Sequence, residues 1–125
     1  MNVHTLLLRQ IHPDFIQNQR VSSQAFRPTP KDERKLSVYD GDLITPAEAF
    51  KHYTKTLNLK SIGVLGVSVK ECKECELPVT PDPAPFLEHV LIDFSGYSNK
   101  AIEKKAKQLK AKAEARGWLH QETRA

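Results

Sequence analysis

Apolar and polar side chains alternate in several short segments of the chain, and a spacing of two predicts strands that bury one face. The segment KLSVYD, residues 35–40, places Leu36 and Val38 on the same face. The segment HVLIDF, residues 89–94, does the same with every second residue from Val90 onward. Further strands are expected at HTLLLRQI, residues 4–11, and at VSSQAFRP, residues 21–28.

The longest apolar segment is SIGVLGVSVKEC, residues 61–72, and it predicts a central strand that is buried on both faces. Gly63 and Gly66 within it indicate either a close approach by another element or a bulge. The next segment, residues 76–86, contains four prolines, which predict an irregular or extended connection.

Two other segments repeat apolar residues every three or four positions, which predicts helices. The first begins at Thr45, a good N-cap, with Pro46 at the first helical position and Glu48 at the third, the pattern of a capping box. Its apolar face continues to Leu57, and Asn58 is a plausible end.

The second helix is expected from Asn99 to Arg116, with Gly117 as its C-terminal cap. A narrow apolar stripe along this helix should dock on the sheet, and the segment after it, Trp118 and Leu119, should fold back onto the body. The stripe consists of Ile102, Ala106, Leu109 and Ala113.

These elements predict one compact α+β domain over residues 1–125, with two helices packed on a mixed, mostly antiparallel sheet of about five strands. A chain of 125 residues that is 39% hydrophobic and 27% charged suits one globular domain. No apolar run approaches the roughly 20 residues of a membrane-spanning helix. The first residues also lack the features of a secretory signal, so we expect a cytoplasmic protein, of microbial type, without a membrane partner.

Positive charge is concentrated in the C-terminal helix, residues 99–117, which carries seven Lys or Arg and two Glu against a net charge of +4 for the whole chain. Such a face can neutralise the phosphates of a nucleic-acid backbone or bind an acidic protein. Lysine dominates it, so contacts to base edges are not expected. The candidate binding residues are Lys100, Lys104, Lys107 and Lys110. The alternative is a solvated helix whose lysine stems cover the edge of the core.

Cys72 and Cys75 form one CxxC motif, which by itself is a weak signal. No histidine follows at the spacing of a zinc finger, and the neighbouring glutamates should raise the pKa of both thiols rather than lower it. A structural or incidental pair is favoured over a metal or redox site, so neither a metal nor another cofactor is expected from this motif.

Several recognisable enzyme motifs are absent from the sequence. There is no P-loop, no GxGxxG turn, no HExxH helix, no EF-hand loop and no GxSxG elbow. What remains is a set of polar residues in a particular order: Arg9 in the first strand, Tyr39 in the third, Glu48 in the helix after it, and Ser95 after the last strand.

This order resembles the RES domain, a small toxin fold related to ADP-ribosyltransferases, and the resemblance extends loosely over most of the chain. It implies a cleft that binds NAD and breaks its nicotinamide bond. Arg9 would hold a phosphate, and the Glu48 carboxylate would stabilise the developing oxocarbenium charge. Tyr39 and Ser95 would complete the cleft. The alternative role of Glu48 is the capping box described above.

The leading hypothesis from the sequence is an accessory or interaction protein that contacts an acidic protein or a nucleic-acid backbone through its basic C-terminal helix. The alternatives are a RES-like toxin that cleaves NAD or transfers ADP-ribose, and an antitoxin or immunity subunit. The sequence does not define the oligomeric state, and it does not show whether the four polar residues converge.

Overall fold

The computed structural model describes residues 1–122, which form an α+β domain around a six-stranded antiparallel sheet. The strand order is β6-β7-β4-β1-β5-β8. Two further short strands, β2 (Ile16–Gln17) and β3 (Arg20–Val21), form a separate hairpin. The six strands are β1 (Leu6–Gln10), β4 (Lys35–Asp40), β5 (Gly63–Ser68), β6 (Val79–Pro81), β7 (His89–Asp93) and β8 (His120–Gln121).

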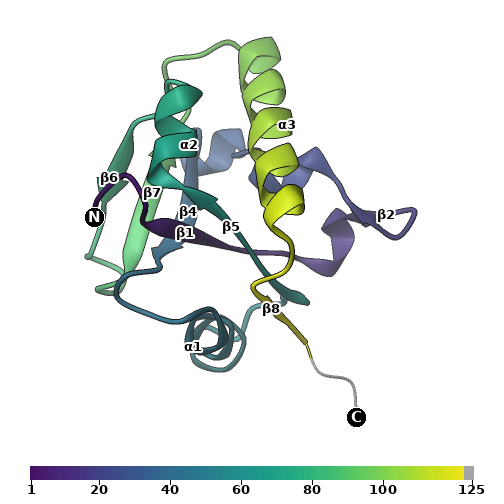
Figure 1. Cartoon of the computed structure of the whole chain (residues 1–125), viewed down its shortest axis with the longest axis vertical. Coiled ribbons are helices and arrows are strands. Elements are labelled where there is room, and N and C mark those ends of the chain that lie inside the picture. Colours follow the sequence, from purple (N-terminus) through teal and green to yellow (C-terminus); the bar gives the residue numbers. More distant parts are fainter. Residues whose placement is uncertain (123–125) are drawn as a thin grey trace.

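Helices cover both faces of this sheet. Helix α1 (Pro46–Lys51) lies on one side, and helices α2 (Val69–Glu74) and α3 (Asn99–Arg116) lie on the other (Figure 1). The α3 side contains the larger core, to which the four predicted stripe residues of α3 contribute. The α1 side contains a smaller cluster built around Leu8, Tyr39, Ala49 and Val64. Alternate side chains of β1 and β4 therefore pack into the larger core on the α3 side and the smaller cluster on the α1 side.

The mostly antiparallel α+β fold predicted from the sequence is confirmed, with differences in individual elements. The prediction of a strand at residues 21–28 is wrong, because Ser23–Phe26 forms a 3₁₀ turn that buries Phe26. Strands β6 and β8 were not expected, and each is only two or three residues long. Both pair with longer neighbours, β7 and β5, so their partners determine their extended conformation more than their own sequences do.

The central strand β5 is buried along its whole length, as predicted, and it ends at Ser68, before the end of the apolar segment 61–72. Ser68 caps helix α2: its hydroxyl accepts from the Glu71 N–H at 3.1 Å, and Glu71 Oε1 accepts from the Ser68 N–H at 2.8 Å. This is a second capping box, with the same spacing as Thr45 and Glu48. The apolar Val69 concealed the helix start in the sequence pattern.

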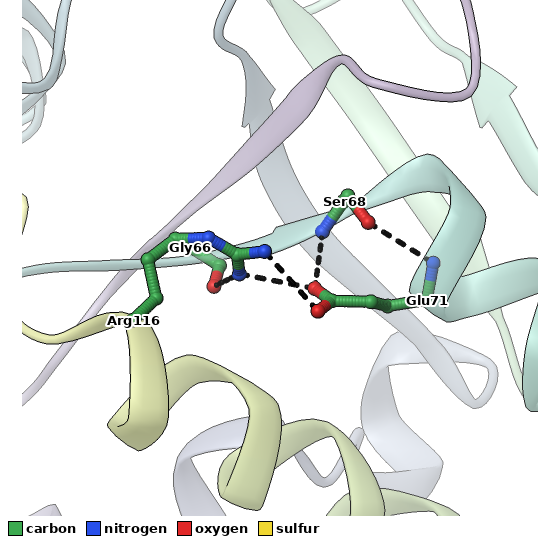
Figure 2. Close-up of polar contacts among 4 residues, drawn as sticks. All are labelled: Gly66, Ser68, Glu71 and Arg116. Carbon is green, nitrogen blue, oxygen red and sulfur yellow. Dashed lines mark hydrogen bonds and ion pairs between the residues drawn. The ribbon is translucent and has the colours of Figure 1, made fainter.

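Arg116, in the last turn of α3, joins this capping box (Figure 2). Its Nη1 and Nη2 donate to Glu71 Oε1 and Oε2 at 3.0 and 3.1 Å, and Nη1 also donates to the Gly66 carbonyl at 2.8 Å. Burial alone would raise the pKa of Glu71, but the hydrogen bonds from Arg116 and Ser68, with the Arg116 charge, lower it. One side chain thus connects α3, β5 and α2.

The segment after α3 folds back onto β5, as predicted, and two glycines make room for it. A Cβ atom on Gly63 would lie 2.5 Å from the His120 carbonyl oxygen and 2.9 Å from the Trp118 ring. A Cβ atom on Gly66 would lie 2.6 Å from a Leu119 methyl group. The Leu119 N–H donates to the Val64 carbonyl at 2.9 Å. The close approach predicted from these glycines is confirmed.

Helix α3 has the predicted bounds, and Gly117 follows it with a φ of +89°. Helix α1 begins at Thr45 as predicted but widens into a π-helical turn over His52–Thr56, where the Leu57 N–H donates to the His52 carbonyl at 3.0 Å. Among the described residues no helix is long and apolar enough to cross a membrane.

Arg116→Ala should lower the free energy of unfolding at pH 7 by roughly 1–2 kcal/mol, because it removes the paired donors of Glu71 at a partly exposed site. The pKa of Glu71 is lowered in the folded protein, so its stabilisation exists above the ordinary carboxyl pKa and disappears as the pH falls through the folded value. Urea unfolding at pH 7 and at pH 3.5 should therefore show a smaller gap between variant and wild type at the acid pH. Arg20→Ala, which removes an exposed pair with Glu114 at 3.4 Å, is the control. Equal losses in the two variants would contradict the role of Arg116.

Gly63→Ala should displace β8, because the new methyl group meets backbone rather than a flexible side chain. We expect a loss of about 1–3 kcal/mol in unfolding free energy, typical of overpacking. Trp118 is the one tryptophan in the chain, so its emission should shift to longer wavelength as its ring loses contact with β5. Gly96→Ala is the matched control, since its Cβ would meet nothing within 4 Å. Unchanged tryptophan emission in Gly63→Ala would show that β8 tolerates the methyl group.

Candidate functional site

The main irregularity of the sheet is a gap between two central strands, β1 and β4. They pair only at Leu7–Asp40 and Leu8–Tyr39. On their other sides both strands continue: β1 pairs with β5 as far as Gln10, and β4 pairs with β7 back to Lys35. The two strands therefore separate where the rest of the sheet is still continuous, and backbone groups along the gap need other partners.

Arg9 spans this gap. Its Nε donates to the Ala25 carbonyl at 2.7 Å, and its Nη1 donates to the Ser37 carbonyl of β4 at 3.1 Å. Burial lowers the pKa of the guanidinium, while the charges of Tyr53 and Asp32 act in the opposite direction, and an arginine remains cationic in such a site. No protein acceptor is found for Nη2 within residues 1–122. One donor group of a half-buried cation is thus available to a ligand.

Two adjoining cavities open at the gap, and Arg9, Asp32 and Ser37 line both of them. The first has a volume of about 490 Å³ and lies under the loop that follows the 3₁₀ turn. It also contains Arg27, an exposed residue. The second has a volume of about 330 Å³ and lies on the α1 side of the sheet. We call the two together the cleft; each volume falls in the range of small-molecule sites.

Aromatic rings form one wall of the second cavity. Tyr39 stacks on Phe86 with ring centroids 5.0 Å apart, and the Tyr39 hydroxyl lies 2.7 Å from His52 Nδ1. Burial, with the nearby charges of Tyr53 and Glu88, raises the pKa of Tyr39, so its phenol stays protonated at neutral pH. Tyr53, carried by the π-helical turn, lines the same cavity.

Gln10 adds an unusual feature to this wall. The side chain is buried, with the residue only 5% exposed, and neither its amide nitrogen nor its amide oxygen has a hydrogen-bond partner within the described part of the chain. An unpaired buried amide costs about 1–3 kcal/mol relative to a paired one. Gln10 is also one of the residues that line the second cavity.

A second set of polar residues, Ser37 of β4, His89 of β7 and Asp82, is connected by hydrogen bonds at the cleft. His89 Nε2 lies 3.0 Å from the Ser37 hydroxyl. His89 Nδ1 lies 3.0 Å from the Asp82 carbonyl oxygen and 3.2 Å from the Asp82 carboxylate. His89 is 8% exposed, whereas Ser37 is exposed and lines both cavities. A hydroxyl, an imidazole and a carboxylate are therefore connected in series at the cleft.

The structure brings together two of the four candidate catalytic residues. Arg9 and Tyr39 both line the second cavity, but Glu48 and Ser95 do not. Glu48 is exposed, and its Oε1 accepts from the Thr45 N–H at 3.1 Å, so its carboxylate closes the cap of α1. Its pKa is lowered by its hydrogen bonds to Thr45. Ser95 is exposed after β7, where its N–H donates to Asp93 Oδ1 at 2.8 Å.

The four candidate lysines of α3 differ in their surroundings. Lys100 and Lys104 are exposed, and no ion pair is found for either within residues 1–122. Lys107 lies 3.8 Å from Glu103, and Lys110, half-buried, lies 3.1 Å from Glu114. Part of the positive charge of the helix is therefore balanced on the helix itself.

The two cysteines are free thiols at the end of α2. Cys72 is buried in the main core, and its burial, with the neighbouring Cys75 and Glu71, raises its pKa to about 12. The pKa of Cys75 is also raised, chiefly by burial. Over residues 1–122, no group of three or more His, Cys, Asp or Glu is placed to hold a metal ion.

The sequence did not identify Gln10 and Ser37 of the cleft, nor Asp82, which contacts His89. Ser37 and Tyr39 alternate on β4, and His89 begins β7, so a shared face could be expected once the two strands are paired. The register that places Ser37 beside His89 depends on tertiary structure. The sequence pattern does not predict the gap between β1 and β4 beside Gln10.

No protein-family model, no curated protein sequence and no solved structure matches this chain.

Proposed function

We propose that this protein binds a phosphate-bearing, nucleotide-type molecule in the cleft between β1 and β4. The observation that carries the proposal is the gap itself, where Arg9 and Tyr39 line one cavity although the strands on either side remain paired. Arg9 and Arg27 supply positive charge at the first cavity, and Arg geometry suits phosphate oxygens. The tyrosines and Phe86 supply apolar ring faces at the second.

NAD is the first ligand to test, for two reasons. The cleft has a cationic part and an aromatic part, which suit the phosphates and the rings of a dinucleotide. Arg9 and Tyr39 are also the two residues of the RES-like layout that line the same cavity. Cleavage of NAD is a further step that needs a carboxylate near the ribose. Glu48 lies in a helix cap instead, so Asp32, which lines both cavities, would have to serve.

Calorimetric titration of the protein with NAD, with ADP-ribose and with nicotinamide tests the proposal. Arg27→Ala should weaken NAD binding by about 10-fold or more, because a charge-assisted hydrogen bond contributes about 1.5–3 kcal/mol. Arg27 is exposed, so its replacement should leave the fold intact. Arg20→Ala, an exposed arginine outside the cleft, should bind NAD like wild type.

Nicotinamide release is measured in the same samples. Binding of both NAD and ADP-ribose without release supports a binding protein, whereas release that Asp32→Asn abolishes supports the NAD-cleaving alternative. No measurable binding of either nucleotide, or equal affinities for the Arg27 and Arg20 variants, would contradict a nucleotide site in the cleft.

A second candidate function is binding of an acidic protein or a nucleic-acid backbone through α3, the leading hypothesis from the sequence. The observation in its favour is the exposure of Lys100 and Lys104 on the side of α3 that faces away from the sheet. The ion pairs of Lys107 and Lys110 weaken it. It predicts binding to many anionic polymers with little sequence preference.

For this second candidate, binding of a 20-nucleotide single-stranded DNA and of poly-glutamate should weaken steeply with added salt. The double reversal Lys104→Glu with Lys107→Glu should reduce affinity by about 10-fold or more at low salt, since each phosphate contact adds to the salt-dependent part of binding. Lys55→Glu with Lys60→Glu, two exposed lysines outside α3, is the charge-matched control. Equal weakening by both double variants would assign the effect to net charge alone and reject a site on α3.

A further inference from the structure

The hydrogen bonds of His89 define which of its ring nitrogens carries the proton. Nδ1 lies within 3.2 Å of two oxygen atoms of Asp82, and both of these oxygens are acceptors when the carboxylate is ionised. Nδ1 must therefore be the N–H donor, which leaves the lone pair of Nε2 free in the neutral ring. The Ser37 hydroxyl, 3.0 Å from Nε2, is then the donor of that hydrogen bond. This polarity makes His89 a base toward Ser37.

The surroundings of Ser37 suit a reacting group. Ser37 is exposed to the cleft, while His89 behind it is buried, so a small molecule reaches the hydroxyl before the imidazole. Gln10 and Ser37 both line the second cavity. Arg9, whose Nη2 has no protein acceptor within the described residues, lines both cavities together with Ser37.

We propose that Ser37, His89 and Asp82 form a nucleophile–base–carboxylate relay, and that the cleft hydrolyses a carboxylic ester. Each part has a stated role: Ser37 is the nucleophile, His89 the general base and acid, and Asp82 a positioning residue that holds the ring in one tautomer. Such a relay is recognised by geometry and roles rather than by the order of its members in the sequence. Arg9, which lines both cavities with Ser37, is the cation that would stabilise the oxyanion.

The reaction balances with water as the only other reactant. Ser37 Oγ bonds to the carbonyl carbon of the ester as its proton passes to His89 Nε2, and the carbonyl oxygen becomes the oxyanion. The bond from carbon to the leaving oxygen then breaks, and His89 returns the proton to that oxygen, which departs as an alcohol. Water attacks the acyl-Ser37 ester with His89 again as base, releasing the carboxylic acid and restoring the Ser37 hydroxyl.

The cleft also indicates the class of ester. Leu57 and Leu59, both exposed, line the second cavity and present an apolar surface to the acyl group. Arg27 lines the first cavity and not the second, so it suits an anionic group on the alcohol portion. The substrate class is therefore an apolar acyl ester of a phosphate-bearing alcohol. This last assignment rests on the proposed function, whereas the relay itself does not.

A fluorophosphonate probe tests the relay, because it labels only an activated serine and needs no knowledge of the natural ester. Mass spectrometry of the intact and digested protein should show one adduct, on Ser37. Ser37→Ala should abolish it, and His89→Gln should slow labelling by about 10²-fold or more, the usual contribution of a general base. Ser95→Ala, a similarly exposed serine outside the cleft, should label at the wild-type rate.

Circular dichroism confirms that the His89 variant is folded, and Ser37→Ala, at an exposed position, provides a second variant that does not depend on a buried residue. No adduct on the folded wild type, adducts spread over several serines, or labelling independent of His89 would overturn the relay. Labelling is then repeated with saturating ADP-ribose. Protection supports the phosphate-bearing ester, and labelling without protection rejects that substrate class while leaving the relay in place.

Discussion

The arrangement of the cleft depends on one side chain, Arg9, which holds two strands apart without leaving their backbones unpaired. Where β1 and β4 stop pairing, the guanidinium donates to the Ser37 carbonyl of β4 and to the Ala25 carbonyl of the 3₁₀ turn. A sheet whose inner strands separate would otherwise expose backbone acceptors in its interior. Arg9 satisfies one of them, the Ser37 carbonyl. A short or apolar residue at this position would either close the sheet or leave the carbonyls unpaired.

Local signals predicted most of the fold, because the energies that fix helix ends act over a few residues. Thr45 and Glu48, and the stripe of α3, could be recognised from spacing alone, and the structure agrees with both. The second capping box, Ser68 with Glu71, has the same spacing but lies inside an apolar run, so periodicity favoured a longer strand. A capping box also explains why Glu48 is absent from the cleft. Its carboxylate satisfies the Thr45 N–H, and the helix start positions it at the surface.

The cleft could be predicted only in part, because it depends on register between strands far apart in the chain. Arg9 and Tyr39 were recognisable as polar groups on neighbouring strands. Ser37 and His89 meet only because Tyr39 pairs with His89, which places Ser37 one diagonal step away on the same face. The buried Gln10 amide is unpaired next to the gap, and Arg9 spans that gap with hydrogen bonds to Ala25 and Ser37. No short sequence motif predicts this register or the gap between the strands.

The basic helix illustrates how composition alone can mislead about a surface. Lys105 donates to the Cys75 carbonyl at 2.6 Å and lies 4.2 Å from the centre of the Tyr97 ring, and Arg116 pairs with Glu71. These cations attach α3 to α2 and to the loop before α3, so they act within the fold rather than at its outer face. Lys107 and Lys110 have acidic neighbours one turn away. Four of the seven cations in residues 99–117 therefore have partners within the fold. In the cleft, Arg9 likewise has a structural part because it pairs two backbone carbonyls, whereas the buried Gln10 amide has no hydrogen-bond partner within the described residues and so does not stabilise the fold.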